Sequence, residues 1–316
     1  MKKDNSLNQR FDAAIKNVKE AALELNTLMI YEKGQVLKHV FEDEEKIGVI
    51  RSISKQVTCL CFGIAIEKGL FKDGLNEKVY PYLIKTQNIT IEKNVAYIKE
   101  WTIKTLLTLT IGIEEAMLNS KHLLTIEGQN YGDVVLNADI KHKAGEYFLY
   151  SNAPMYLASI VFQNALNISL LDFANEHIFS KMGFTVKKWK QSPQGYCMGC
   201  TGIEMQAEEL LDLGILMLNK GVFNGQRIVS SNWIDEMFKI QVLTPLMYDE
   251  TRVLPKYAYG LNTWITKDHI YYCDGTDGQY LIVVPKQERV IVTIGNQKNM
   301  KPITVALADL IKEGIN

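Results

Sequence analysis

Residues 51–69 read RSISKQVTCLCFGIAIEKG, a polar start followed by about ten mostly apolar residues and a glycine. This pattern predicts a helix that begins near Ser52 and ends near Gly69. Ser52 and Lys55 are three positions apart, so they lie on one face of its first turn. An amine is then placed beside a hydroxyl at a helix N-terminus, where the outward-pointing N–H groups favour developing negative charge.

The spacing of Ser52 and Lys55 predicts a serine nucleophile with lysine as its base, because serine activated by lysine is an established arrangement with the signature S-x-x-K. The motif alone is a weak signal. A chain with 11 serines and 30 lysines contains about one S-x-x-K by chance, and this chain has one. The alternative interpretation is an ordinary helix start in which serine is the cap.

The composition is that of a globular protein, since 47% of the 316 residues are hydrophobic and 22% are charged. The net charge of −1 and the absence of a basic block argue against nucleic acid as a partner. The N-terminal residues show no apolar secretory segment, and the run after Lys55 is too short to span a membrane. We therefore expect a cytoplasmic protein without a membrane partner, in which the five cysteines are reduced.

Hydrophobic periodicity separates the two ends of the chain from its middle. Strands are predicted at residues 28–31, 36–41, 257–266, 269–273, 279–284 and 289–294. Helices are predicted at residues 11–25, 103–109, 113–119, 153–166, 170–182, 205–219, 232–238 and 302–312. This arrangement predicts one sheet built from both termini. Residues 1–50 and 200–316 would form an α/β sheet domain, residues 51–199 a helical domain, and the active site would lie in the cleft between them.

Seven short segments carry a family resemblance, and they occur in the order that the family has. They are SISK (52–55), GIAIEKG (63–69), TIKTLLT (102–108), GEYFLYSN (145–152), GCTG (199–202), YGLNTW (259–264) and GQYLIVVP (278–285). The chain resembles the serine β-lactamase and penicillin-binding-protein superfamily over Leu28 to Asn296. Within it, the likeness is strongest to class C-like esterases and amidases such as the 6-aminohexanoate-dimer hydrolases.

The resemblance implies an α+β fold in which an antiparallel sheet is flanked by helices and an all-helical domain is inserted. It also implies that Ser52 is the acylated nucleophile, Lys55 its base and Tyr150 the phenol of the second motif. Asn152 would bind the acyl amide of the substrate. The backbone N–H groups of Ser52 and Thr276 would form the oxyanion hole.

The third motif departs from the family pattern. Where β-lactamases carry Lys-Thr-Gly or His-Thr-Gly, the register set by Gly278-Gln279 puts Cys273-Asp274-Gly275 here. The missing cation argues against β-lactamase activity, because in the family it helps to bind the carboxylate of the substrate. Asp274 and Asp277 would instead suit an ammonium group, and Trp264 would line the pocket.

Other interpretations stay open for several of these residues. Tyr150 could be an ordinary aromatic at a helix entry, and Asn152 could be only a helix cap. Cys197 and Cys200 form a C-x-x-C without a second pair, which favours a reduced pair over a zinc site. Cys273 would be a thiol on the wall of the cleft. The five histidines match no triad or metal signature and are interpreted as surface or structural residues.

The residues together predict a serine hydrolase that cleaves a small ester or amide through an acyl-enzyme on Ser52, with neither metal nor organic cofactor. The substrate is expected to be a small molecule and to carry an amine. Two alternatives remain: an acyltransferase that uses the same acyl-enzyme, and a non-catalytic binding or sensor protein of the same fold. The sequence leaves the oligomeric state open.

Overall fold

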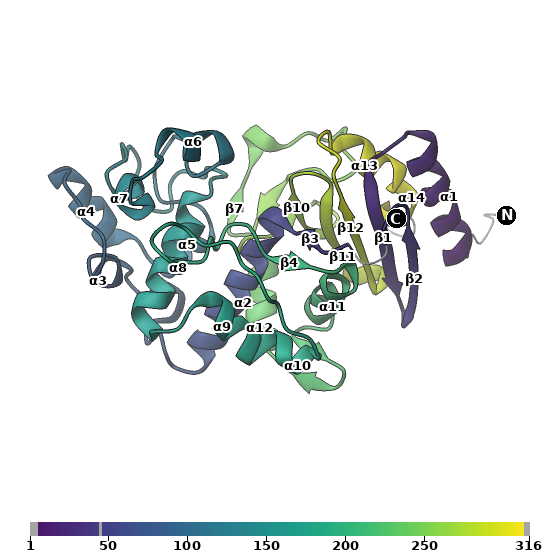
Figure 1. The fold of residues 1–316 in the computed structure, drawn as a ribbon, viewed down its shortest axis with the longest axis horizontal. Coiled ribbons are helices and arrows are strands. Elements are labelled where there is room, and N and C mark those ends of the chain that lie inside the picture. Colours follow the sequence, from purple (N-terminus) through teal and green to yellow (C-terminus); the bar gives the residue numbers. More distant parts are fainter. Residues whose placement is uncertain (1–5, 44–45, 313–316) are drawn as a thin grey trace.

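The computed structural model describes residues 6–43 and 46–312 of the chain. The extreme N-terminus, on which the expectation of no secretory segment rests, lies outside the described residues. The main feature is an antiparallel sheet of eight strands in the order β2-β1-β12-β11-β10-β9-β8-β7 (Figure 1). The strands are β1 (Leu25–Glu32), β2 (Gln35–Val40), β7 (Val242–Leu243), β8 (Ala258–Tyr259), β9 (Trp264–Ile265), β10 (Tyr271–Gly275), β11 (Gln279–Val284) and β12 (Arg289–Gly295). This confirms the predicted fold class.

The two ends of the chain meet at the pairing of β1 with β12, in which Met29 lies opposite Val292. β11 is buried at every position and β12 at all but its last, because helices cover both faces of the sheet centre. The 3₁₀ turn Pro285–Gln287 joins these two strands.

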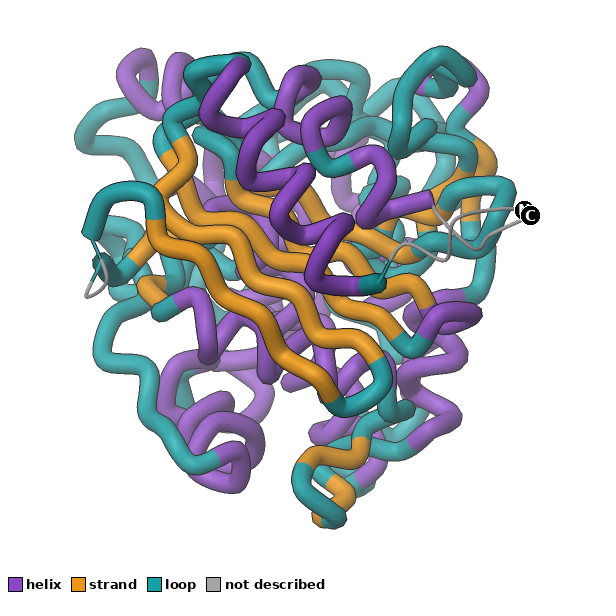
Figure 2. The backbone as a smooth tube through the Cα atoms, turned by 90° about the vertical axis from the view of Figure 1, so that its right-hand side faces the viewer, coloured by secondary structure: helices purple, strands orange, loops and turns teal. Residues whose placement is uncertain are grey.

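Helices from both chain ends cover one face of the sheet: α1 (Leu7–Glu20), α13 (Lys301–Ala306) and α14 (Ala308–Lys312) (Figure 2). Helix α11 (Ala207–Leu218) packs on β1, β11 and β12 from the other side. It packs closely there because Gly214 has no side chain. A Cβ at Gly214 would lie 2.4 Å from Val290 Cγ1.

The remaining helices lie on the side of the molecule away from α1 (Figure 1). They are α2 (Ser54–Glu67), α3 (Tyr80–Leu83), α4 (Glu92–Glu100), α5 (Ile103–Leu107), α6 (Ser120–Thr125), α7 (Tyr131–Leu136), α8 (Ala153–Leu166), α9 (Leu170–Ala174), α10 (Ser180–Met182) and α12 (Ser231–Phe238). Two small two-stranded sheets complete the fold: β3 (Gly48–Val49) with β4 (Glu204–Met205), and β5 (Val222–Phe223) with β6 (Gln226–Arg227). The division into two domains at residues 50 and 200 stays a prediction.

The predicted helix over residues 113–119 is wrong. Gly112 and Leu118 have left-handed backbone conformations, with φ of +85° and +59°. Ile113 instead forms a β-bridge with Ile140. The N–H of Met117 donates to Ser151 Oγ at 3.0 Å, so a side chain replaces the helical partner.

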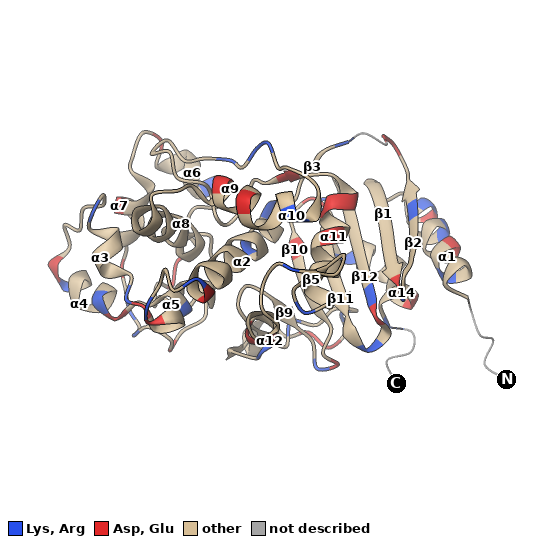
Figure 3. Ribbon diagram, turned by 90° about the horizontal axis from the view of Figure 1, so that it is seen from below, with Lys and Arg blue, Asp and Glu red and all other residues tan. Residues whose placement is uncertain are grey.

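Charged residues of both signs are interspersed over the elements of the described chain (Figure 3). No single helix among residues 6–43 and 46–312 has the length and apolar character to cross a membrane. The pair Ala153–Leu166 and Leu170–Met182 reaches that length only when taken together, and it bends by 80° at the break.

Candidate active site

Ser52 lies in the 3₁₀ turn Arg51–Ile53, which leads directly into α2. The N-cap of α2 is Ile53, and no side chain caps the helix. The interpretation of Ser52 as a helix cap is therefore wrong. The turn leaves its hydroxyl to accept a hydrogen bond from Lys55 Nζ at 2.9 Å, as the three-residue spacing predicts.

Lys55 is buried, with 1% of its surface exposed. Its Nζ also donates to Asn152 Oδ1 at 3.1 Å and to the carbonyl oxygen of Cys200 at 3.0 Å. Burial lowers the pKa of Lys55 to about 8, although the nearby Cys200 and Asp274 side chains act in the opposite direction. A buried amine with this pKa is partly neutral near neutral pH, so it can accept a proton.

The carbonyl of Cys200 is held in place by the first turns of α2. Thr58 Oγ1 donates to the carbonyl oxygen of Gly199 at 2.8 Å, and the N–H of Ile203 donates to Ser54 Oγ at 3.2 Å. The same helix that carries Lys55 thus fixes one of the acceptors of its amine.

Tyr150 lies beside both Ser52 and Lys55. Lys55 Nζ is 5.1 Å from the centroid of its ring, and the ring stacks on Trp264 at 5.3 Å between centroids. Burial and then the Asp274 carboxylate raise the pKa of Tyr150, whereas a side-chain interaction with Ser52 lowers it. The net shift is upward. Tyr150 is therefore a protonated phenol at neutral pH, and Lys55 is the stronger candidate for the base.

Asn152 joins two parts of the site. Its Oδ1 accepts from Lys55, and its Nδ2 donates to the carbonyl oxygen of Leu118 at 3.0 Å. Asn152 occupies the N-cap position of α8 but makes no side-chain cap hydrogen bond, so the interpretation as only a cap is wrong. Its amide orients the lysine.

A cavity of about 560 Å³ opens over Ser52. Asn152 and Thr276 share its wall with Ser52, although the three come from distant parts of the chain. The rest of the lining is mixed: Val49, Arg51, Leu118, Asn119, Ser120, Leu123, Lys188, Trp189, Lys190, Gln191, Thr201, Gly202 and Glu204. Such a cavity can receive a small molecule with both apolar and polar groups.

The hairpin between β10 and β11 brings Thr276 to the cavity. Gly275 pairs with Gln279, so residues 276–278 form the tip. Within the described chain, neither the N–H of Ser52 nor that of Thr276 donates to a protein acceptor. The two residues predicted to supply the oxyanion donors therefore both line the cavity.

The third-motif side chains are placed differently from the expectation. Cys273 and Trp264 are 4% and 1% exposed, and neither lines the cavity. Gly275, Asp274 and Asp277 are also absent from its wall. In a β-strand successive side chains alternate between faces, and here Cys273 points into the protein, where burial raises the pKa of its thiol. The expectation of a thiol on the cleft wall is wrong.

Both carboxylates of this region already have cationic partners. Asp274 pairs with Lys256 at 3.2 Å and accepts from Trp264 Nε1 at 2.9 Å. Asp277 pairs with Arg51 at 2.8 Å. These ion pairs remove the charge argument for an ammonium-bearing substrate.

Lys256 and Arg51 are the site residues that the sequence analysis missed. Lys256 lies in the loop before β8, and its Nζ is 4.2 Å from the Trp264 ring and 5.6 Å from the Tyr150 ring. No local motif marks it, because its position depends on the tertiary fold. Arg51 had one signal, its position directly before Ser52.

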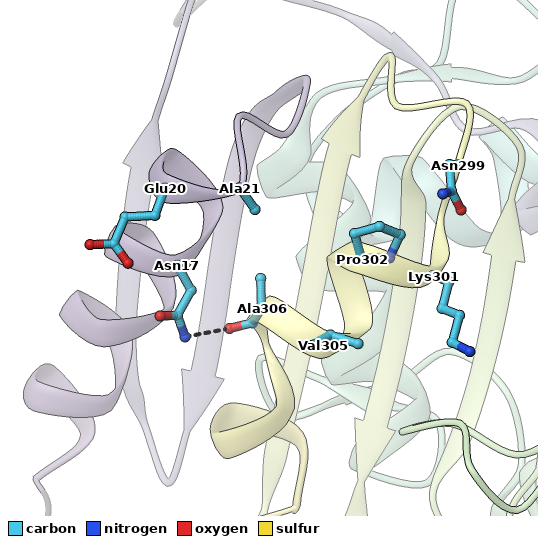
Figure 4. Close-up of a pocket in the computed structure, with 8 residues that line it drawn as sticks. All are labelled: Asn17, Glu20, Ala21, Asn299, Lys301, Pro302, Val305 and Ala306. Atoms are coloured by element: carbon cyan, nitrogen blue, oxygen red, sulfur yellow. Dashed lines mark hydrogen bonds between the residues drawn. The ribbon is translucent and has the colours of Figure 1, made fainter.

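All five cysteines are free and buried. Within the described residues, no three His, Cys, Asp or Glu side chains gather in a way that could hold a metal ion. Another depression, of about 710 Å³, lies between α1 and α13 (Figure 4). Its lining residues include Asn17, which donates to the carbonyl oxygen of Ala306 at 3.2 Å, but none of the predicted site residues.

Comparison with known proteins gives the family. The beta-lactamase family model matches residues 27–314, so the chain belongs to the beta-lactamase family. No curated protein sequence matches the chain.

Solved structures agree with this fold. A candidate 6-aminohexanoate-dimer hydrolase from Bacillus anthracis has a TM-score of 0.75 at 16% identity, over 94% of this chain and 79% of that one. EstCE1, a hydrolase with promiscuous acyltransferase activity, has a TM-score of 0.75 at 15% identity, over 96% and 97%. An octameric penicillin-binding protein homologue from Pyrococcus abyssi has a TM-score of 0.73 at 16% identity, over 96% and 76%.

Proposed function

We propose that this protein is a serine hydrolase that cleaves a small ester or amide through an acyl-enzyme on Ser52. One observation carries the proposal. The buried Lys55 Nζ lies 2.9 Å from Ser52 Oγ, and the pKa of this lysine is about 8. At pH 7 roughly a tenth of such an amine is neutral, which is enough to serve as a general base.

The short distance between Ser52 and Lys55 supports the following acylation step. The Ser52 hydroxyl transfers its proton to neutral Lys55 while its oxygen forms a bond to the substrate carbonyl. The resulting oxyanion is stabilised by the N–H groups of Ser52 and Thr276, and losing one such donor reduces the rate about 100- to 1,000-fold in comparable enzymes. As the bond to the leaving group breaks, Tyr150 relays the proton from Lys55 to the departing oxygen or nitrogen.

Deacylation is the reverse of this sequence with water in place of the leaving group. Water gives its proton to Lys55 and its oxygen bonds to the acyl carbon, after which Ser52 regains a proton and the acid departs. The scheme uses no metal and no organic cofactor. We place the reaction in the cytoplasm, with a small molecule as the partner.

The substrate is limited by the cavity. Its size of about 560 Å³ suits a small acyl group. Because Asp274 and Asp277 are ion-paired, they do not require the substrate to carry an amine. The Cys273-Asp274-Gly275 motif supplies no side-chain cation of its own, so penicillin hydrolysis is not part of the proposal.

Steady-state hydrolysis of 4-nitrophenyl acetate and butyrate, followed by absorbance, tests the proposal. The wild-type protein should turn over these esters, and Ser52→Ala should lose at least about 1,000-fold in kcat/KM. Equal rates in the two proteins would refute it and leave the binding or sensor alternative.

Acyl transfer is the second candidate, because the same acyl-enzyme can react with an amine or alcohol in place of water. EstCE1, which shares the fold, is described as having promiscuous acyltransferase activity. Product analysis with a competing amine separates the two: free acid as the main product indicates hydrolysis, and an amide indicates transfer.

A further inference from the structure

Arg51 and Asp277 form an ion pair beside the cavity, with 2.8 Å between Nη2 and Oδ2. Arg51 directly precedes Ser52, and Asp277 directly follows Thr276. The pair therefore connects the two backbone segments that carry the proposed oxyanion donors.

Both residues have left-handed backbones, with φ of +50° for Arg51 and +68° for Asp277. Aspartate tolerates this conformation, but arginine rarely adopts it. A strained residue persists only where its surroundings hold it in place, and such residues gather at functional sites. The ion pair with Asp277 is one contact that holds Arg51.

The two segments also meet at the level of the backbone. A Cβ at Gly275 would lie 2.7 Å from the carbonyl oxygen of Ile50 and 2.8 Å from Arg51 Cβ. The β10–β11 hairpin therefore packs so closely on the 3₁₀ turn that contains Ser52 that only glycine fits at position 275. The ion pair spans this same junction.

We infer that Arg51 and Asp277 are positioning residues, which fix the separation of the Ser52 and Thr276 amides. This inference rests on the proposed function. Two simpler accounts compete with it. An exposed ion pair contributes little to stability, and the Arg51 side chain is 44% exposed. Alternatively, Arg51 lines the cavity and could bind an anionic group of the substrate.

The test combines Asp277→Asn, Arg51→Gln and the double variant. Asparagine keeps the shape of aspartate and tolerates the left-handed backbone. For each protein we would measure kcat and KM with a neutral and an anionic 4-nitrophenyl ester. We would also measure the inhibition constant of a phenylboronic acid, which forms a tetrahedral adduct with serine.

A positioning role predicts that each single variant loses about 10-fold in kcat on both esters, less than the loss of a whole donor. KM should change by less than about twofold, and boronate affinity should fall in parallel with kcat, because both report binding of the tetrahedral state. The double variant should lose no more than the worse single variant, since the two residues act as a unit.

Glu100→Gln is the matched control, because it removes an ion pair with Lys78 of the same 2.8 Å length, and neither residue lines the cavity. It should leave kcat unchanged. Unchanged kcat and boronate affinity in Asp277→Asn and Arg51→Gln would overturn the inference, as would a rise in KM confined to the anionic ester. In both cases the proposed function still holds if the wild-type protein turns over the esters and Ser52→Ala does not. A wild type without such turnover would refute both.

Discussion

Lys55 combines full burial with three oxygen acceptors around its amine, from Ser52, Asn152 and Cys200. Burial disfavours the ammonium form, whereas the nearby Cys200, Asp274 and Cys273 side chains limit how far the pKa of Lys55 falls. A general base is most effective when its pKa lies near the pH at which the enzyme works, and the pKa of Lys55 is about 8. Tyr150, with its raised pKa, stays protonated over the same range.

The pKa of Lys55 sets the expected pH dependence of activity. The reaction needs the neutral amine, so kcat/KM for a 4-nitrophenyl ester should rise with pH and level off above about pH 8. Lys55→Met should lose about 1,000-fold and show no such rise, apart from the background reaction with hydroxide. A wild-type profile that is flat from pH 6 to 9 would contradict the role of Lys55 as base.

Lys256 and Asp274 should shift this profile in opposite directions. The Asp274 carboxylate raises the pKa of Lys55, and Lys256 partly neutralises that carboxylate. Lys256→Met should therefore move the midpoint up by about half a unit to one unit, and Asp274→Asn should move it down. Shifts of the same sign in the two variants would show that the ion pair does not act through charge.

The residues of the candidate site differ in how far the sequence could predict them. The three-residue spacing of Ser52 and Lys55 marks them as candidates, but the order of the other motifs along the chain was needed to favour a catalytic role. Tyr150 and Thr276 required the order of motifs along the chain, because nothing local distinguishes them from other tyrosines and threonines. Lys256 could not be found either way, since a long loop brings it to Asp274 only in the folded protein.

At the scale of elements, α2 is the central support of the site. It is buried from Ser54 to Ala65 and packs against α8, α9 and the 3₁₀ turn that holds Ser52. Trp233 of α12 lies flat against it at Gly63, where its Nε1 donates to the carbonyl oxygen of Cys59 at 3.1 Å. A Cβ at Gly63 would lie 2.3 Å from that nitrogen.

The contact between Trp233 and Gly63 predicts whether Gly63→Ala raises or lowers the stability of the protein. Gly→Ala in an open helix stabilises by up to about 1 kcal/mol, whereas overpacking a core reduces stability by about 1 to 3 kcal/mol. Gly63→Ala should therefore lower the free energy of unfolding, measured by urea denaturation. A gain in stability would show that Trp233 moves aside freely.

Helices and strands are predicted correctly where the local sequence pattern determines them, and wrongly where long-range contacts do. The helix predicted over residues 153–166 has the bounds of α8, because its long apolar periodicity is interrupted only at Asn167, which has a left-handed backbone. The helix predicted over residues 113–119 does not form, because its backbone partners lie in residues 140–151. Such long-range pairing leaves no trace in a short window of sequence.

At the scale of the whole molecule, an ion cluster joins the two ends of the chain. Glu32 on β1 pairs with Arg10 of α1 at 3.0 Å and with Arg289 of β12 at 2.6 Å. Arg289 also donates to the carbonyl oxygen of Leu310 in α14 at 2.6 Å. Burial opposes ionisation of Glu32, but the two guanidinium groups outweigh it and lower the pKa of Glu32.

Glu32→Gln should destabilise the protein by about 3 kcal/mol, because it removes the carboxylate from two buried arginines. A folded-state pKa below the unfolded value means that this contribution is present above about pH 4.5 and is lost as the pH falls. Urea denaturation at pH 7 and pH 4 should therefore show a smaller difference between wild type and variant at the lower pH. A difference that grows on acidification would contradict the account.

The most direct test of the central claim is the intact mass of the protein after treatment with a fluorophosphonate at pH 8. Attack by an activated Ser52 displaces fluoride, so the wild-type protein should gain one phosphonyl group, located to Ser52 by peptide mapping. Ser52→Ala should gain none, and Lys55→Met should react far more slowly. An unmodified wild-type protein, or a label on another residue, would contradict the account.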